Sequence, residues 1–479
     1  MISPLLTDLY QLTMAYGYWK LNLHDREAVF HQIFRKNPFG GNYAVCAGLG
    51  TVIEFLQNWH FSEDDIAYLG HLKAPDGTKL FPHEFLMYLK NLRFTCHVDA
   101  IPEGTVVFPH EPLLRITGPL LQGQLIESTL LNIINFQTLI ATKASRVCRA
   151  AQGDTVLEFG MRRSQGLDGA LSASRAAYIG GCAATSNVLA GKRFDIPVRG
   201  THAHSWVTAF PDEMQAFSAY ADVMPNNCVL LVDTFDTVLG VKHAIEVGKK
   251  LRANGAKLRG IRLDSGDMTA LSIKARELLD AAGFQETQII ASNSLDEYVI
   301  DKMKKDGAKV TVWGVGTNLM TAYDHPALDG VYKLSALRDE KGAWQYKLKI
   351  SEQPIKISNP GIHQVRRFFV DGVAEIDVMY DTQLGISEAP EATLFDTSGT
   401  HKKIADYDAF VDLLVPVFDR GQCVYPDETI HAIQKRAKQE TDLFVNAHQQ
   451  KHYPVGLEQQ LFSKKQTLIA EVIQANELF

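Results

Sequence analysis

Residues 258–267 read LRGIRLDSGD, a short apolar run that leads directly into a polar turn containing glycine. The same pattern recurs between residues 154 and 319, where each β-rich run is followed by a polar turn and then by a helical pattern. The runs lie at residues 156–159, 196–198, 229–232, 258–261, 288–291 and 310–313. Neighbouring runs start about 20 to 40 residues apart, which is the size of a βα unit. We therefore predict consecutive parallel strands that are buried on both faces.

Polar residues follow these runs one after another, and their distribution favours one of two folds. They are Arg162 and Arg163, residues 201–204, Asp233 and Thr234, residues 264–267, Asn293 and Ser294, and residues 314–317. A doubly wound sheet needs polar loops only at its single switch point. A (β/α) barrel builds its site from the loops at the carboxyl ends of all its strands. The sequence therefore predicts an α/β fold with an irregular (β/α) barrel over residues 151–330 as the catalytic domain.

The regions before residue 154 and after residue 319 have different sequence patterns. Residues 7–18 have a helical pattern, residues 93–118 look extended, and residues 120–151 form one long helical pattern. We predict that residues 1–150 form an N-terminal α/β domain, completed by C-terminal segments. Residues 331–479 are predicted to form a β-meander followed by a mostly helical tail that packs on both domains.

Composition excludes several classes of protein. The chain has 479 residues, of which 46% are hydrophobic and 22% charged, the usual mixture for a globular protein rather than a disordered or fibrous one. A net charge of −7 gives no basic excess, so we expect no nucleic-acid partner. The six cysteines form no CxxC pair, no apolar run is long enough for a membrane helix, and the first residues do not resemble a signal peptide. These features predict a cytoplasmic enzyme without a membrane partner.

Residues 314–317 read GVGT and follow an apolar run at the start of a predicted helix. Glycines allow backbone N–H groups to approach an anion closely, and late barrel strands often carry phosphate sites. The pattern therefore favours phosphate binding by Gly314, Gly316 and Thr317, with a plain glycine turn as the alternative.

Two further strand ends carry arginine beside groups that recognise flat or hydroxylated ligands. Arg262 and Asp264 are two residues apart and point the same way from a strand. Asp264 or Asp267 could bind a ribose or hold Mg²⁺. Phe159 precedes Arg162 and Arg163, and an aromatic ring could lie between Phe159 and a guanidinium plane. The alternatives are a structural ion pair and a core phenylalanine beside surface arginines.

The pair His202 and His204 allows two interpretations. A His-x-His pair after a strand can bind a metal, but further ligands would be needed, and His243 is the only histidine between His204 and Gly316. One histidine could instead act as a nucleophile or as an acid–base catalyst while the other is structural.

Five short motifs in order resemble the nicotinate phosphoribosyltransferase family, a type II phosphoribosyltransferase family. They are Thr7-Asp8-Leu9-Tyr10, Phe159-Gly160-x-Arg162-Arg163, Gly200-Thr201-x-Ala203-His204-Ser205, Arg262-x-Asp264-Ser265-Gly266-Asp267 and Gly314-x-Gly316-Thr317. Each motif is weak alone, but together their order and spacing match over nearly the whole chain. The resemblance implies the irregular barrel of that family and the conversion of nicotinate and phosphoribosyl pyrophosphate to nicotinate mononucleotide and pyrophosphate, coupled to ATP hydrolysis.

The resemblance also assigns residues to roles. It implies that the catalytic residues are His204, Arg262 and Asp264. It implies that the substrate-binding residues are Asp8, Tyr10, Phe159, Arg162, Arg163, Ser186, Gly200 and Thr201. The 5′-phosphate is expected on the backbone of Gly314, Gly316 and Thr317.

In that family pattern, Phe159 and Arg262 sandwich the pyridine ring, and Tyr10 stacks on it from the neighbouring subunit of a homodimer with shared sites. His204 accepts the γ-phosphoryl group of ATP and becomes a phosphohistidine. Mg²⁺ accompanies ATP and phosphoribosyl pyrophosphate, so no resident metal and no tightly bound organic cofactor are expected.

Three other functions remain alternatives at this point. The related nicotinamide enzyme carries an Asp where Ser186 stands here, and an Asp would repel the carboxylate of nicotinate, whereas a Ser can donate a hydrogen bond to it. A metal-dependent barrel hydrolase would use His202 and His204. A non-catalytic relative would not need the full set of charged residues.

Overall fold

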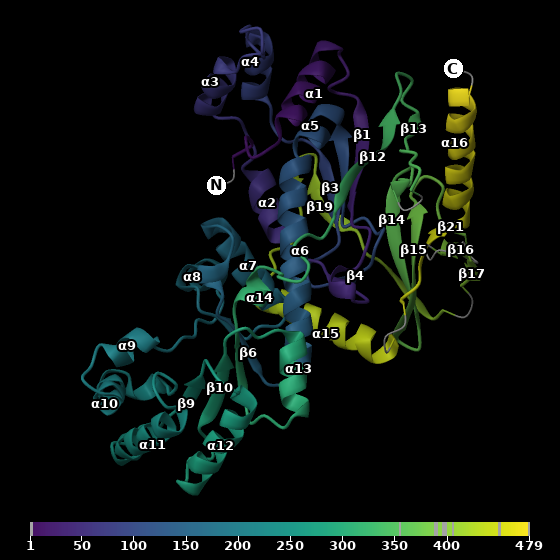
Figure 1. Cartoon of the computed structure of the whole chain (residues 1–479). Coiled ribbons are helices and arrows are strands. Elements are labelled where there is room, and N and C mark those ends of the chain that lie inside the picture. Colours follow the sequence, from purple (N-terminus) through teal and green to yellow (C-terminus); the bar gives the residue numbers. More distant parts are fainter. Residues whose placement is uncertain are drawn as a thin grey trace. The chain divides into compact units, whose positions relative to one another are not determined.

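The chain forms two compact units in the computed structural model shown in Figure 1. The structure describes residues 3–353, 356–387, 391–394, 400–404, 407–448 and 452–477. The first unit spans Met1–Leu139, Ala327–Thr429 and Lys435–Phe479, and the second spans Ile140–Pro326 and Ile430–Gln434. The region after residue 330 therefore belongs to the first unit, except for five residues, Ile430–Gln434.

The second unit contains a parallel sheet of six strands in the order β7-β6-β11-β10-β9-β8. The strands are β6 (Thr155–Glu158), β7 (Ala184–Thr185), β8 (Val229–Leu231), β9 (Gly260–Leu263), β10 (Gln288–Ser292) and β11 (Val312–Val315). Five of the six predicted runs overlap these strands, and the α/β prediction is confirmed. The run at residues 196–198 was wrong as a strand, because Pro197 has no N–H to donate to a ladder. Val198 makes only an isolated bridge to Thr185 of β7.

The sheet curls without closing into a hydrogen-bonded barrel. The first and last strands of the unit, β6 and β11, pair with each other, as a barrel requires. Among the described residues, however, β7 and β8 remain edge strands, so the predicted barrel is not confirmed. Residues from both edges, Ala184 and Val229, nevertheless share one buried apolar cluster with Leu157, Ile290 and Val312. This cluster is the core beneath the carboxyl ends of the strands.

One α-helix follows each strand of the second unit along the chain, except that three helices follow β7 (Figure 1). They are α7 (Leu167–Ile179), α8 (Val188–Phe194), α9 (His204–Thr208), α10 (Glu213–Val223), α11 (Thr237–Ala253), α12 (Met268–Ala281), α13 (Glu297–Lys305) and α14 (Thr317–Met320). Asn187, Asp236, Asp267 and Asp296 each accept a hydrogen bond from the first turn of the helix that follows. Several polar residues of the loops are thus helix caps, which satisfy otherwise unpaired N–H groups.

The first unit is built on two larger sheets. One has the order β13-β12-β1-β5-β3-β19-β20 and the other β17-β16-β21-β15-β14-β18, with a small pair β2-β4. Their strands are β1 (Glu27–Ile33), β2 (Ala44–Val45), β3 (His97–Ala100), β4 (Val106–Val107), β5 (Leu114–Pro119), β12 (Val331–Arg338), β13 (Trp344–Tyr346), β14 (His363–Val370), β15 (Val373–Asp381), β16 (Glu391–Leu394), β17 (His401–Lys403), β18 (Ala409–Asp412), β19 (Val415–Asp419), β20 (Gln422–Cys423) and β21 (Val455–Glu458). Strands from the beginning and end of the chain therefore share one sheet, as β3 and β19 do.

The remaining helices are α1 (Leu9–Lys20), α2 (Leu49–Gln57), α3 (Glu63–His71), α4 (His83–Asn91), α5 (Leu120–Leu125), α6 (Glu127–Ala150), α15 (Ile430–His448) and α16 (Gln459–Glu477). The long helical pattern at residues 120–151 is two helices, because the chain breaks at Ile126. The tail contains strands β18 to β21 as well as two helices, so the prediction of a mostly helical tail was incomplete. No helix among the described residues has the length and apolar character needed to cross a membrane.

Candidate active site

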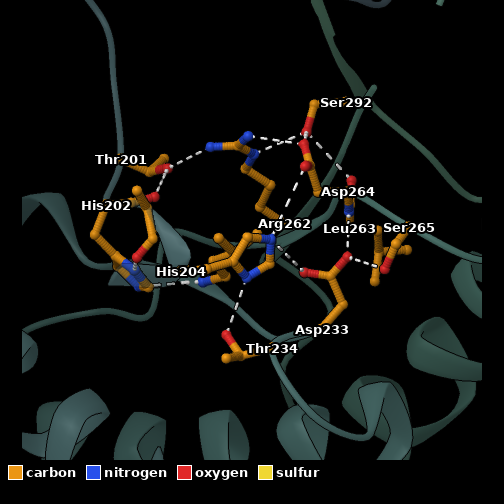
Figure 2. A network of polar contacts seen from close by, with 12 residues as sticks. Thr201, His202, His204, Asp233, Thr234, Arg262, Leu263, Asp264, Ser265 and Ser292 are labelled. Carbon is orange, nitrogen blue, oxygen red and sulfur yellow. Dashed lines mark hydrogen bonds and ion pairs between the residues drawn. The ribbon is translucent and has the colours of Figure 1, made fainter. Parts of the chain in front are cut away.

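Polar side chains gather where β8, β9 and β10 end, as Figure 2 shows. Arg262 on β9 is the centre of this group. Its Nε donates to Ser292 Oγ at 2.8 Å, its Nη2 to Asp264 Oδ1 at 2.8 Å, and its Nη1 to Thr201 Oγ1 at 3.3 Å. The expected common orientation of Arg262 and Asp264 is therefore observed. Three partners on three different segments hold the guanidinium group in one plane.

His204 lies between two carboxylates at the start of α9. Its Nε2 is 3.8 Å from Asp233 Oδ1 and 3.9 Å from Asp264 Oδ2, and its Nδ1 is 3.1 Å from Thr234 Oγ1 (Figure 2). The imidazole is 43% exposed, so solvent or a ligand can reach it.

Asp233 is almost fully buried but uses only one of its two oxygens. Oδ2 accepts hydrogen bonds from the Asp264 N–H at 2.7 Å and from Ser265 Oγ at 2.8 Å. Oδ1 accepts none from the described residues. A buried carboxylate oxygen without a donor is costly, so this atom is available to a ligand or to a charged imidazole.

The carboxyl group of Asp264 is stabilised as an anion. Burial works to raise the pKa of Asp264, but the hydrogen bonds from Ser292 and Arg262, with the positive charge of Arg262, outweigh it and lower the pKa below its ordinary value. Asp264 therefore stays ionised at neutral pH and can accept hydrogen bonds from hydroxyl groups of a ligand.

Phe159, directly after β6, brings an aromatic ring to the same edge. The guanidinium carbon of Arg262 lies 5.9 Å from the centre of the Phe159 ring. A side chain at Gly314 would place its first carbon 2.7 Å from that ring, and one at Gly160 would lie 2.8 Å from the Gly316 carbonyl oxygen. These glycines are required because the ends of β6 and β11 pack closely.

Glu158 is a buried residue that joins the segments around Phe159, and it was not among the predicted site residues. Its carboxylate accepts hydrogen bonds from Gly160 N–H, from Ser174 Oγ at 2.9 Å and from Thr185 Oγ1. Its backbone carbonyl accepts from the Ser186 N–H at 2.9 Å. A charged residue inside an otherwise apolar strand run was the signal that could have identified it.

The other predicted binding residues of this unit lie on the loops around this edge. Arg162 and Arg163 form a short 3-10 turn after Phe159, and both side chains are exposed. Ser186 is half-buried at the end of β7, and Gly200 is exposed two residues before His202. Thr201 contacts Arg262 directly, as described above.

The GVGT segment forms the end of β11 and the beginning of α14. Gly314 is buried against Phe159, whereas Gly316 is half-buried and Thr317 is exposed. The neighbouring loop carries strain, because Asn293 and Ser294 both have positive φ, at 89° and 52°. Strained backbone of this kind clusters at functional sites, and this loop directly follows β10 at the same edge of the sheet.

Asp8 and Tyr10 belong to the first unit, whereas the residues above belong to the second. Asp8 Oδ2 accepts a hydrogen bond from Ser128 Oγ at 2.6 Å. Tyr10 is 49% exposed on α1, and partial burial together with the charge of Glu127 raises the pKa of its hydroxyl group.

Two observations bear on metal binding. Among the described residues, no group of three or more His, Cys, Asp and Glu side chains has an arrangement suited to a metal ion. His202 points away from the carboxylates that face His204 (Figure 2), so the two histidines do not converge on one point. The geometry therefore gives no support to a His-x-His metal centre.

Comparisons with known proteins identify the family. The family models described as nicotinate phosphoribosyltransferase N-terminal domain, family and C-terminal domain match residues 5–135, 155–358 and 362–465. The nicotinate phosphoribosyltransferase of Bacillus subtilis is 42% identical over 478 residues, covering 97% of this chain and 95% of that protein. The chain belongs to the nicotinate phosphoribosyltransferase family.

Solved structures agree with this assignment. The crystal structure of human nicotinic acid phosphoribosyltransferase has a TM-score of 0.84 and 29% identity, with 96% of this chain and 99% of that chain covered. A nicotinate-nucleotide pyrophosphorylase from Pyrococcus furiosus shares the fold, with a TM-score of 0.69 at 22% identity over 91% and 95% of the two chains. The matching family models and relatives are named as nicotinate phosphoribosyltransferases, which are enzymes, so the nicotinamide enzyme, the metal-dependent hydrolase and the non-catalytic relative are not favoured.

Proposed function

We propose that this enzyme joins nicotinate to C1 of the ribose of phosphoribosyl pyrophosphate. The products are nicotinate mononucleotide and pyrophosphate, and ATP is hydrolysed to ADP and phosphate in the same cycle. The observation that carries the proposal is the group of Arg262, Asp264, His204 and Asp233 at one edge of a parallel sheet, in a chain of this family. The reaction brings the free acid into NAD salvage.

Phe159 and Arg262 are the proposed contacts of the pyridine ring. A flat ring between them needs about 7 Å, twice the usual contact distance of about 3.5 Å. The separation of 5.9 Å between the Arg262 guanidinium carbon and the Phe159 ring centre is shorter. Binding therefore has to widen this gap by about 1 Å, and the loss of the Thr201 hydrogen bond, the longest of the three to Arg262, would cost least.

Asp264 is the proposed partner of the ribose hydroxyl groups. Departure of pyrophosphate leaves positive charge on the ribose ring, as in glycoside chemistry, and the nitrogen of nicotinate attacks C1. The ionised carboxylate of Asp264 can stabilise that charge without a covalent bond to the protein. Arg162 and Arg163 are exposed at the same edge and provide positive charge for the nicotinate carboxylate or for the phosphates. The backbone of Gly314, Gly316 and Thr317 is the proposed cradle of the 5′-phosphate.

His204 is the proposed acceptor of the γ-phosphoryl group of ATP. In this step a bond forms between an imidazole nitrogen and phosphorus, the bond to the β-phosphate oxygen breaks, and ADP leaves. Water later cleaves the phosphohistidine and releases phosphate. The partial exposure of the imidazole supports this role, and Thr234 at Nδ1 fixes the orientation of the ring.

We propose that Mg²⁺ enters with the phosphates of ATP and phosphoribosyl pyrophosphate, where it neutralises their charge. The Oδ1 atom of Asp233, which has no donor among the described residues, and the Oδ2 atom of Asp264 fit such a cation, because both are carboxylate oxygens near the proposed phosphoryl acceptor.

We also propose a cytoplasmic homodimer with shared active sites. Support for the dimer comes from α1, which exposes Leu9, Tyr10 and Met14 on the first unit. The six free thiols fit a reducing compartment. Mixing Tyr10→Ala and His204→Ala chains tests the sharing, because only a mixed dimer with shared sites regains ATP-stimulated turnover. Additive activities of the two separate variants would contradict it.

The function itself is tested by measuring mononucleotide formation. The purified protein is incubated with phosphoribosyl pyrophosphate, Mg²⁺ and either nicotinate or nicotinamide, with and without ATP. We expect product from nicotinate, faster with ATP. Product from nicotinamide alone would transfer the assignment to the related amide-using activity.

A further inference from the structure

The parallel sheet of the second unit is open between its two edge strands, β7 and β8. We call this gap the seam. On one side, the chain after β7 reaches Val198, which bridges Thr185. On the other side lies the edge strand β8. The Val232 N–H donates to the Arg262 carbonyl oxygen of β9 at 3.1 Å. Because successive N–H groups of a strand alternate in direction, the Leu231 N–H points the other way, into the seam.

The side chain of His202 crosses this seam. Its Nε2 accepts a hydrogen bond from the Leu231 N–H at 3.2 Å, and its Nδ1 lies 3.2 Å from the Ala203 carbonyl oxygen. Since a carbonyl can only accept, Nδ1 carries the proton and the ring is neutral. The ring is only 7% exposed and packs edge-on against Tyr220 of α10, with 4.7 Å between ring centres.

These contacts leave no free nitrogen on His202. The lone pair of the neutral ring lies on Nε2 and accepts from the Leu231 N–H, while Nδ1 carries the proton that faces the Ala203 carbonyl, so no lone pair is available to a phosphoryl group. Burial, together with the nearby positive charge of Arg262 and His204, lowers the pKa of His202 and keeps the ring neutral. His204 differs from it, because its side chain is 43% exposed and its Nε2 faces two carboxylates.

The two histidines have the same spacing along the chain as the two residues that they contact at the end of β8. His202 bonds to Leu231, and two residues further along each segment His204 faces Asp233. The hydrogen bond between His202 and Leu231 therefore sets the distance between His204 and Asp233. We propose that His202 is a positioning residue, whose hydrogen bond to Leu231 closes the seam and holds His204 opposite Asp233. This inference rests on the proposed function of His204 as the phosphoryl acceptor.

Two matched variants separate the hydrogen bond from the packing. In His202→Gln, the side-chain Oε1 can occupy the place of Nε2 and accept from Leu231. In His202→Phe, an aromatic ring remains against Tyr220 but no acceptor is left. The measurements are transfer of labelled γ-phosphate from ATP to the protein, turnover of nicotinate with and without ATP, and amide hydrogen exchange of the peptide that contains Leu231.

We expect His202→Phe to slow labelling and ATP-stimulated turnover by about tenfold to a hundredfold, the usual cost of displacing a reacting group. Turnover without ATP should change by less than about threefold, and exchange at Leu231 should accelerate. His202→Gln should restore the labelling rate and protection at Leu231 to within about threefold of the unmodified enzyme.

Several results would overturn the inference. They are equal labelling in both variants and the unmodified enzyme, equal loss in both variants, or labelling that persists in His204→Ala. If the unmodified enzyme takes no label, the proposed role of His204 fails instead. Hydrogen exchange at Leu231 still decides in that case whether His202 closes the seam, because it does not depend on ATP.

Discussion

At the scale of single residues, the site depends on two carboxylates in different electrostatic situations. Asp264 has two donors on one of its oxygens, since the Ser292 hydroxyl and the Arg262 guanidinium group both bind its Oδ1. Asp233 keeps Oδ1 without a donor among the described residues, although its side chain is buried. The donors around Asp264 stabilise its carboxylate as an anion. Asp233 instead presents an oxygen that can still accept a hydrogen bond beside His204.

His204→Ala removes the proposed phosphoryl acceptor without touching the contacts of Arg262. We expect loss of ATP stimulation and of acid-labile phosphate, while ATP-independent turnover stays within about threefold of the unmodified enzyme. Initial rates with and without ATP measure this. His243→Ala serves as the control for loss of a histidine outside the edge, since His243 pairs with Glu213. Full ATP stimulation in His204→Ala would disprove the role.

Ser186→Asp tests the choice between the acid and the amide. A carboxylate at this position would repel nicotinate and could accept a hydrogen bond from nicotinamide. We expect kcat/KM for nicotinate to fall at least about tenfold. Competition between the two pyridines measures the change, and Ser186→Asn is a neutral control of similar size. An unchanged preference would show that Ser186 does not face the carboxylate.

At the scale of elements, Glu158 connects β6, β7 and α7 through hydrogen bonds to Gly160, Thr185 and Ser174. These are the elements that carry Phe159 and Ser186. Burial works to raise the pKa of Glu158, and the same hydrogen bonds oppose this shift. The carboxylate thus joins the segments that lead into Phe159 and Ser186, the proposed pyridine end of the site.

Glu158→Gln should weaken this connection, because an amide NH₂ would face a donor where the carboxylate has only acceptors. We expect the free energy of unfolding to drop by about 1 to 3 kcal/mol and KM for nicotinate to rise. Urea denaturation and steady-state kinetics measure the two effects. Glu286→Gln on the surface is the matched control, for which neither quantity should change. Unaltered stability of Glu158→Gln would refute the role.

At the scale of the whole molecule, the first unit contains a buried histidine pair that makes its stability depend on pH. His31 and His363 stack with 4.2 Å between ring centres, and both are 3% exposed. Burial lowers the pKa of both, that of His363 to about 4. In the unfolded chain a histidine titrates near 6.5, so the unfolded state binds more protons between about pH 4 and 6.5. Stability is therefore present above pH 6.5 and is lost as the pH falls through this range.

His363→Gln keeps a donor for the Pro360 carbonyl, which His363 Nε2 contacts at 2.8 Å, and removes one titrating group. We expect the loss of stability between pH 7.5 and 5 to shrink by about 2 kcal/mol relative to the unmodified protein. Urea unfolding at the two pH values measures this. His60→Gln, at an exposed position, is the control for loss of a histidine that is not buried. The same pH dependence in His363→Gln would exclude the pair as its source.

The sequence by itself determined the alternation of strands and helices between residues 154 and 319 and the edge at which the polar residues collect. The strand–helix pattern and the polar edge could be predicted because apolar runs and polar turns each consist of consecutive residues. The motifs around Phe159, His204 and Arg262 were found for the same reason.

Only the tertiary structure decided how the sheet ends and what the two histidines contact. Whether β7 and β8 pair depends on distances across the fold. Whether the Leu231 N–H reaches His202 Nε2 depends on the same distances. The roles of Glu158 and Asp233 also depend on partners far apart in sequence, such as Thr185 and Ser265. A side chain's chemistry is local, but its hydrogen-bond partners and burial are set by the packing of the whole unit.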